Sequence, residues 1–524
     1  MMRPLRTPAN LATRYPIMRL RRVLPSLVAC AIGAGAAVTG CTKLDLTNPN
    51  QPSTSIFWKT QADAIAGTNA AYNGLLNNGT YGRWLAFALD IRSDEGRAPS
   101  PWADLSNFNK FTLSDYDFEV NRELFIHHYQ AIFRANQVID IVPGISMDAT
   151  LRSRLVAEAK FIRGLLYFNL VNLFGNVPLQ ITMSQPQDLP ATSAPAAVFA
   201  QIEKDLTEAA AALPTSYSGA DVGRATKGAA LALLGKVQLQ QLKFAQASAT
   251  LAQVIAIPGY DLMANYADNF TSSAENNKES VFEVQFGDRT QLASGVRGLN
   301  IAKMVGACGP GFCDGRPTRW FFDQFSRELT TTGGIDPRRD VTIFSPTSTD
   351  VYGKTYVQRY GGDTEIFFKK YGEYYLSVDQ DWDAPINYRV IRFADVLLMY
   401  AEALNGDNKT AQAYTYINRV RARVNLAPLP ANLSLTEMRD RILHERLLEF
   451  GLEGQRWLDL KRYSLLSSVV KADAGTALCP TASEPYVAGC DDEFRFFTAG
   501  KSELLPIPQT ERNLNPRVDQ NPGW

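Results

Sequence analysis

Four of the six cysteines form two close pairs, Cys308 with Cys313 and Cys479 with Cys490. Each pair lies in a stretch rich in Gly, Pro, Ser and Thr, which predicts a loop. Cysteines this close form local disulfides in an oxidising compartment. The alternative is one zinc site, but it would need four thiolates from two loops far apart in the sequence, and neither pair has CxxC spacing. The pattern favours two disulfides in an exported protein.

The start of the chain indicates export. Basic residues around Arg19 precede an apolar run at 23–38, and a small residue comes directly before Cys41. This order is typical of a secretory signal, and its end resembles the lipobox of bacterial lipoproteins. The run is too short for a good membrane-spanning helix. We therefore predict removal of residues 1–40 and a diacylglycerol thioether on Cys41, with Met18 as an alternative start of the chain.

Composition places the rest of the chain among ordinary globular proteins, with 45% hydrophobic and 20% charged residues in 524. The formal net charge is zero. Residues 1–40, however, hold six arginines and no acidic residue, so the remainder keeps 47 of 53 basic and all 53 acidic side chains, a net charge of −6. This balance argues against nucleic acid as a partner and against a basic face for membrane docking.

Apolar periodicity predicts a mainly helical scaffold that positions these residues. The clearest stripe runs along 151–174, where apolar residues recur three and four positions apart. Small residues where two helices would touch, such as Ala230 and Gly235, are typical of a tetratricopeptide-like hairpin at 226–255, and a similar hairpin is predicted at 393–424. Ordinary antiparallel helix pairs are the alternative. Further helices are predicted at 61–76, 121–142 and 196–213.

Two long stretches, residues 79–120 and 258–386, lack helical periodicity. The second is rich in Gly, Asn, Thr, Asp and aromatic residues and contains a strand-like run at 279–286. Long irregular insertions in a compact protein are usually functional. We expect helices to form the scaffold of a domain at 61–524, a few short strands, and insertions that form the working surface. Residues 41–60 are predicted to be a tether.

A charged run near the C-terminus invites a catalytic interpretation, with two carboxylates as acid and base. Helical spacing explains the run more simply, because Arg441 and Glu445 are i,i+4 neighbours and Arg446 and Glu449 are i,i+3 neighbours. We therefore expect structural ion pairs in this run and no catalytic centre in the chain.

Acidic residues alternate at Asp379, Asp381 and Asp383, as they do in a calcium loop. The turn glycine of such a loop is missing, and its twelfth position is Val390. We expect no cofactor, with a structural calcium ion as the alternative.

Strings along almost the whole chain after Cys41 resemble the SusD/RagB family of outer-membrane nutrient-binding lipoproteins. Their order and spacing carry the resemblance more than any single string does. The strings include LDLTNPNQP at 44–52, IFRAN at 132–136, AEAKFIRGLLYFNL at 157–170, LFGNVP at 173–178, RVIRFADVLLMYAEA at 389–403, EGQRWLDLKR at 453–462 and QNPGW at 520–524.

The resemblance implies a mostly α-helical fold of four tetratricopeptide-like hairpins that carries an irregular ligand-binding half. It also implies a partner, a TonB-dependent outer-membrane barrel of the SusC type, which the lipoprotein covers like a lid. Ligands of the family are mostly oligosaccharides, with peptides in some members.

Sugars present apolar CH faces and a rim of hydroxyl groups, so their receptors combine planar aromatic rings with polar side chains. The irregular stretches offer both kinds of residue, and we expect the two stretches to form one surface. The predicted ligand-binding residues are Asp94, Arg97, Trp102, Trp320, Tyr356 and Trp382.

The sequence therefore predicts a non-enzymatic lipoprotein, anchored in the outer membrane and facing the exterior, that captures an oligosaccharide and passes it to a barrel transporter. Three alternatives stay open. The same fold could bind peptides, the chain could be a lipoprotein glycoside hydrolase with two carboxylates across a cleft, or it could be a scaffold that uses its helices for protein contacts alone.

Overall fold

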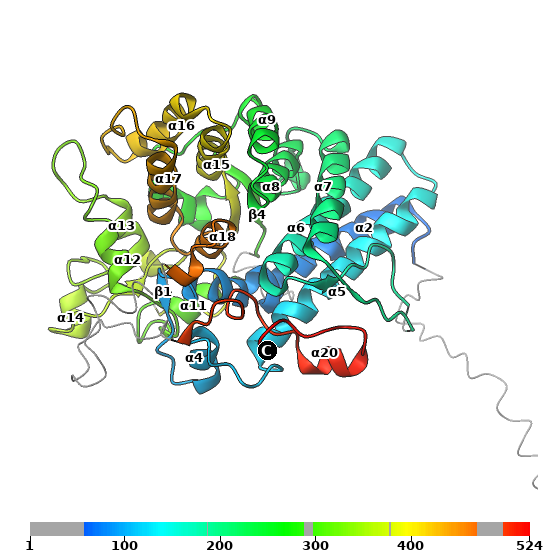
Figure 1. Ribbon diagram of the computed structural model, residues 1–524, viewed down its shortest axis with the longest axis horizontal. Coiled ribbons are helices and arrows are strands. Elements are labelled where there is room, and N and C mark those ends of the chain that lie inside the picture. The colour runs from blue at the N-terminus through cyan, green and yellow to red at the C-terminus, as the bar shows by residue number, and fades with distance from the viewer. Residues whose placement is uncertain (1–56, 186, 288–296, 377–378, 469–495) are drawn as a thin grey trace, which may run out of the picture. The chain divides into compact units, whose positions relative to one another are not determined.

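The computed structural model describes residues 57–185, 187–287, 297–376, 379–468 and 496–524, and these are mainly helical (Figure 1). The long helices are α2 (Gln61–Asn73), α5 (Glu119–Ile141), α6 (Ala149–Phe174), α7 (Pro195–Ala212), α8 (Lys227–Gln240), α9 (Phe244–Ile255), α15 (Phe393–Gly406), α16 (Thr410–Arg423) and α17 (Leu435–Phe450). Shorter helices are α3 (Trp84–Ala86), α4 (Ala103–Asn109), α11 (Ile301–Val305), α12 (Arg319–Gln324), α13 (Arg338–Thr342), α14 (Tyr356–Tyr360), α18 (Arg456–Arg462) and α20 (Gln509–Leu514).

The long helices pack as successive antiparallel neighbours. Helix α5 contacts α2 and α6, α7 contacts α6 and α8, and α9 contacts α8 and α15, which pairs with α16. The labels can be followed in this order across Figure 1, while α12, α13 and α14 lie at the left of that view. The mostly helical fold with hairpins, predicted from the sequence, is confirmed, and the predicted helix ends agree with the observed ones to within a few residues.

Local sequence explains where the helices begin and how closely they approach. Helix α6 begins after Asp148, whose carboxylate accepts a hydrogen bond from the Leu151 amide at 2.8 Å, and it ends at Gly175 in a left-handed conformation (φ 68°). Gly235 of α8 lies against Leu251 of α9, where an added Cβ would come within 2.6 Å of the leucine side chain. The small residues predicted at this hairpin are therefore required by its packing.

Four short antiparallel pairs supply the strands. The pairs are β1 (Gly96–Arg97) with β5 (Arg316–Pro317), β2 (Val177–Pro178) with β3 (Thr192–Ser193), β4 (Ser280–Val284) with β8 (Tyr388–Arg392), and β6 (Ile343–Phe344) with β7 (Phe367–Phe368). Strand β4 matches the strand-like run predicted from the sequence. The β1–β5 pair joins the two insertions to each other.

The first insertion differs from the expectation of an irregular working surface. Residues 78–98 form tight helical turns and α3, and every residue from 80 to 98 except Arg83 is buried. Helix α18 packs on the turn Phe87–Ile91. The prediction failed here because polar residues in a non-periodic stretch were taken to face solvent, whereas most of them have partners inside the protein.

A buried network of charges joins α17 to three other elements. Arg338 of α13 donates to Glu445 at 2.7 Å and to Glu449 at 2.9 Å, and Arg423 of α16 and Arg392 of β8 also bind Glu449. Burial alone would raise the pKa of Glu449, but the guanidinium groups of Arg423, Arg392 and Arg338 outweigh it and hold that pKa below its usual range.

This network corrects the predicted pairing. The role is structural, as expected, but Arg441 and Arg446 pair with residues elsewhere in the chain rather than with Glu445 and Glu449 one helical turn away. Arg441 pairs with Glu328 at 2.9 Å, and Arg446 pairs with Asp395 at 2.7 Å and Asp459 at 2.8 Å. The carboxylates that could have served as acid and base are fully engaged by arginines.

Several predictions concern residues outside the described ranges. These are the signal at 1–40, the lipid site Cys41, all but the last few residues of the tether at 41–60, and the pair Cys479 and Cys490. Within the described ranges, no helix combines the length and the apolar character needed to cross a membrane.

Candidate ligand-binding site

Two solvent-exposed aromatic side chains from the second insertion lie against each other. The rings of Phe312 and Trp382 have centroids 5.9 Å apart and planes at 44°, and the two residues are 50% and 37% exposed. Two exposed aromatic rings in contact form an apolar patch of the kind that can mark a ligand-binding site. We call this pair, with the Arg83 and Lys303 side chains that contact it, the aromatic platform.

Arg83 connects the platform to the first insertion. Its guanidinium carbon lies 5.0 Å from the Trp382 ring centroid and 4.1 Å from that of Trp84. Trp84 is fully buried and donates its indole N–H to Glu123 at 2.8 Å. Trp102 packs edge-on against Trp84 with centroids 6.0 Å apart. The expected meeting of the two insertions therefore occurs here.

Backbone contacts fix the segment that carries Trp382. Leu299 and Ala384 form a β-bridge, and the Asn300 side-chain amide donates to the Trp382 carbonyl at 2.8 Å. Asp383 accepts hydrogen bonds from the Gly298 amide at 3.2 Å and from Asn300 at 3.3 Å. The position of Trp382 is thus fixed through backbone contacts, and its ring remains exposed at the surface.

The acidic run predicted as a possible calcium loop lies in this segment. Asp383 is engaged by the contacts to Gly298 and Asn300, and no group of three or more His, Cys, Asp or Glu side chains suited to a metal ion occurs in the described part of the chain.

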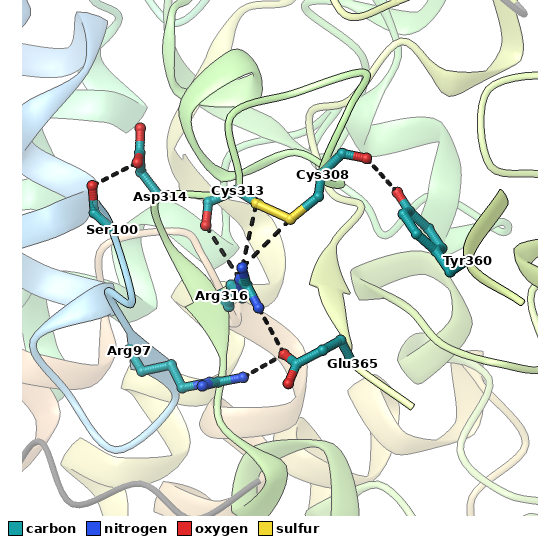
Figure 2. Close-up of a disulfide and its surroundings, with 8 residues drawn as sticks. All are labelled: Arg97, Ser100, Cys308, Cys313, Asp314, Arg316, Tyr360 and Glu365. Atoms are coloured by element: carbon teal, nitrogen blue, oxygen red, sulfur yellow. Dashed lines mark hydrogen bonds and ion pairs between the residues drawn. A yellow bond between two sulfur atoms is a disulfide. The ribbon is translucent and has the colours of Figure 1, made fainter. Parts of the chain in front are cut away.

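Phe312 stands on a loop closed by a disulfide (Figure 2). Cys308 and Cys313 are bonded, with Cα atoms 4.9 Å apart, so this predicted disulfide is confirmed. Lys303 places its ammonium group 5.1 Å from the Phe312 ring centroid and donates to the Pro310 carbonyl at 2.8 Å. The loop therefore supplies an aromatic ring to the platform, and Lys303 of the preceding helix α11 supplies a cation beside it.

Three of the predicted ligand-binding residues lie inside the protein instead. Asp94 is 1% exposed, and both its carboxylate oxygens accept hydrogen bonds from Arg456, at 2.8 and 2.7 Å. Arg97 is 6% exposed and pairs with Glu365 at 2.6 Å. Tyr356 is fully buried and donates its hydroxyl to the Glu365 carbonyl. Their exposure and hydrogen bonding make them supports of the fold rather than ligand contacts.

The three tryptophans predicted to bind ligand lie in different environments. Trp382 belongs to the platform, and half-buried Trp102 packs behind it through Trp84. Trp320 of α12 is also half-buried, but the guanidinium carbon of Arg456 lies over its ring, 5.9 Å from the ring centroid. Sequence analysis missed Phe312, whose signal was a large aromatic residue in a Gly-Pro-Gly loop between two cysteines.

The platform has the chemistry of a stacking site. Two rings at an angle can cover the apolar faces of a ring-shaped ligand, and the flanking Arg83 and Lys303 can donate hydrogen bonds at its edge. The arrangement is suited to holding a polyhydroxylated or extended ligand on the surface.

Comparison with known proteins gives a consistent result over nearly the whole chain. The sequence profile described as "SusD family" matches residues 278–524, and the profile described as "Starch-binding associating with outer membrane" matches residues 44–239. SusD-like protein P2 of Formosa agariphila is 28% identical over 521 residues, covering 93% of this chain and 97% of its own.

Solved structures agree with these matches. A SusD superfamily protein from Bacteroides vulgatus superposes with a TM-score of 0.77 at 27% identity, covering 89% of this chain and all of its own. A laminarin-binding SusD-like protein superposes with a TM-score of 0.72 at 31% identity, with the same coverage of both chains. Together with the helical hairpins, these matches show that the chain belongs to the SusD family.

Proposed function

We propose that this protein is a surface lipoprotein that binds a carbohydrate on the aromatic platform and delivers it to a TonB-dependent outer-membrane transporter. The single observation that carries the binding step is the exposed Phe312–Trp382 pair, with 5.9 Å between ring centroids and one cation over each ring. Aromatic rings stack on the CH faces of sugars, and the donors around them fit hydroxyl groups.

The family supports a glucan as the first ligand to test. One matching profile is described as starch-binding, and the relative with a TM-score of 0.72 is described as laminarin-binding. Neither description fixes the sugar or linkage that this chain prefers. Laminarin oligosaccharides and malto-oligosaccharides are therefore two defined probes for the platform.

Delivery to a barrel rests on the family and on the predicted lipid at Cys41. A lipid anchor confines the protein to the membrane plane, which raises its effective concentration near a partner there. Since the net charge without residues 1–40 is only −6, we expect shape and apolar contact to dominate docking. Copurification of a TonB-dependent barrel from gently solubilised membranes tests this step, and consistent purification of the protein alone contradicts it.

We also propose that the protein binds without catalysis. The buried carboxylates of α17, Glu445 and Glu449, are each held by arginines, so they are not free to act as acid and base. Incubation of the purified protein with laminarin and with starch should leave both polymers intact by chromatography. Release of shorter sugars would favour the hydrolase alternative.

Calorimetry with the two oligosaccharide series tests the binding site. Trp382→Ala should lower affinity about tenfold to a hundredfold, the range expected for loss of one stacking ring, with little change in the melting temperature. Trp320→Ala is the matched control, because it removes the same side chain from a half-buried position on α12. Equal affinity of Trp382→Ala and the unmodified protein contradicts the site, and binding of peptides but of neither sugar series contradicts the ligand class.

A further inference from the structure

The loop that carries Phe312 is rich in glycine and therefore too flexible to keep one conformation without a restraint. Its six residues are Cys308, Gly309, Pro310, Gly311, Phe312 and Cys313. Gly309 has φ 94°, and Cys313 has φ 50°, in the left-handed region that residues other than glycine rarely adopt. Two glycines in six residues give the open loop large conformational freedom. Its folded shape therefore needs a restraint.

The disulfide and the side chains around it provide that restraint, as Figure 2 shows. Arg316 directs its guanidinium group to both sulfur atoms at 3.5 Å and to the Cys313 carbonyl at 3.3 Å. Glu365 binds Arg316 at 2.8 Å on the side away from the sulfurs. Tyr360 donates its hydroxyl to the Cys308 carbonyl at 2.7 Å.

The same loop is tied to the segment that carries Trp382. The Gln380 amide donates to the Pro310 carbonyl at 3.2 Å, and the Phe312 amide donates to the Lys303 carbonyl at 2.8 Å. The Phe312 loop is therefore linked to the Trp382 segment by the hydrogen bond between Gln380 and Pro310. A second link runs from Phe312 through Lys303 to Asn300, which binds the Trp382 carbonyl. The disulfide closes the loop that carries Phe312.

We propose that the Cys308–Cys313 disulfide is a positioning device for ligand capture, which holds Phe312 on the aromatic platform so that affinity depends on the closed loop. This inference rests on the proposed carbohydrate-binding function. Phe312 is half exposed and gains little from packing, so an open loop lets the ring leave the platform. Binding must then order the ring again, and that ordering lowers affinity.

A mutant cycle with laminarin and malto-oligosaccharides tests the coupling. Phe312→Ala should lower affinity about tenfold, and Cys308→Ser with Cys313→Ser should lower it about three- to tenfold, because one freed side chain must be ordered on binding. In the Phe312→Ala background the two serine changes should cause no further loss of sugar affinity. Additive losses would overturn the inference, because a disulfide that merely supports the fold acts independently of Phe312.

Reduction of the folded protein gives a second test that does not depend on folding of the serine variant. Dithiothreitol transfers two electrons and two protons to the S–S bond, yielding two thiols, and itself becomes a cyclic disulfide. A chain with Cys479→Ser and Cys490→Ser limits the reaction to Cys308 and Cys313. Reduction should lower affinity as the serine changes do and shift the Trp382 emission to the red, measured by difference from Trp382→Phe.

The outcomes separate this inference from the function on which it rests. If no sugar of either series binds the unmodified protein, the proposed function fails. If Trp382→Ala weakens binding while opening of the disulfide changes neither affinity nor Trp382 emission, the positioning role alone is wrong.

Discussion

The two insertions place similar residue types in opposite environments. In residues 80–98 the charged side chains of Asp90, Asp94 and Glu95 are at most 1% exposed. In the second insertion Phe312 and Trp382 are 50% and 37% exposed. Residues 80–98 of the first insertion are part of the core, and the second insertion carries the surface that a ligand can reach.

This difference shows that residue type alone does not identify a binding surface. Asp94 and Trp382 were equally plausible ligand contacts by side-chain chemistry. Both carboxylate oxygens of Asp94, however, accept hydrogen bonds from Arg456 inside the protein. Trp382 is held through its backbone carbonyl, and its ring stays exposed. Substitutions at the buried residues of 80–98 should therefore act on stability, and substitutions at Phe312 and Trp382 should act on binding.

Asp94→Asn should give the largest effect on stability. It leaves the Arg456 guanidinium buried without its counter-charge, and breaking a buried ion pair in this way costs about 3–5 kcal/mol. Urea unfolding measures the loss. Asp379→Asn is the matched control, because it makes the same change at an exposed acid of the second insertion and should alter stability by about 0.5 kcal/mol or less.

Sugar affinity of the folded Asp94→Asn protein should equal that of the unmodified chain. A loss of affinity without a loss of stability would show that Asp94 contributes to ligand binding. It would contradict the proposed difference between the two insertions.

A pair of buried carboxyl groups predicts a pH dependence in the first insertion. Asp90 accepts the Gly454 amide at 2.7 and 3.0 Å, and Glu95 accepts the Leu452 amide at 3.1 Å. Burial raises the pKa of Asp90 to about 7, and burial with the nearby Asp90 charge raises the pKa of Glu95 well above its usual value. The folded pair therefore keeps protons that the unfolded chain releases near pH 4.

The sign follows from proton binding. Because the folded state binds more protons, the stability due to this pair is fully present below about pH 4 and is lost as the pH rises through about 7. Glu95→Gln imitates the protonated acid and should flatten this slope. Urea unfolding at a series of pH values measures it, and an unchanged slope in Glu95→Gln would show that the pair does not hold the extra protons.

The scaffold could be predicted from the sequence because its signals are local. Periodicity along 151–174 and the small residues of the 226–255 hairpin determine helices within one or two turns. The partner of Asp94 could not be predicted, since Arg456 lies 362 residues further along the chain. Phe312 was missed for a related reason, because its exposure depends on how a loop of six residues folds against the Trp382 segment.

The smallest effect is expected at Trp320, which tests where the platform ends. Its ring is half-buried on α12 and lies 5.9 Å from the Arg456 guanidinium. Trp320→Ala should cost about 1 kcal/mol of stability, from the lost cation–π contact and partial burial, and leave sugar affinity unchanged. Calorimetry and urea unfolding on one preparation separate the two effects. An affinity loss comparable with that of Trp382→Ala would extend the ligand surface to α12, because the loss of packing at a distant helix has no direct route to stacking on the Phe312–Trp382 pair.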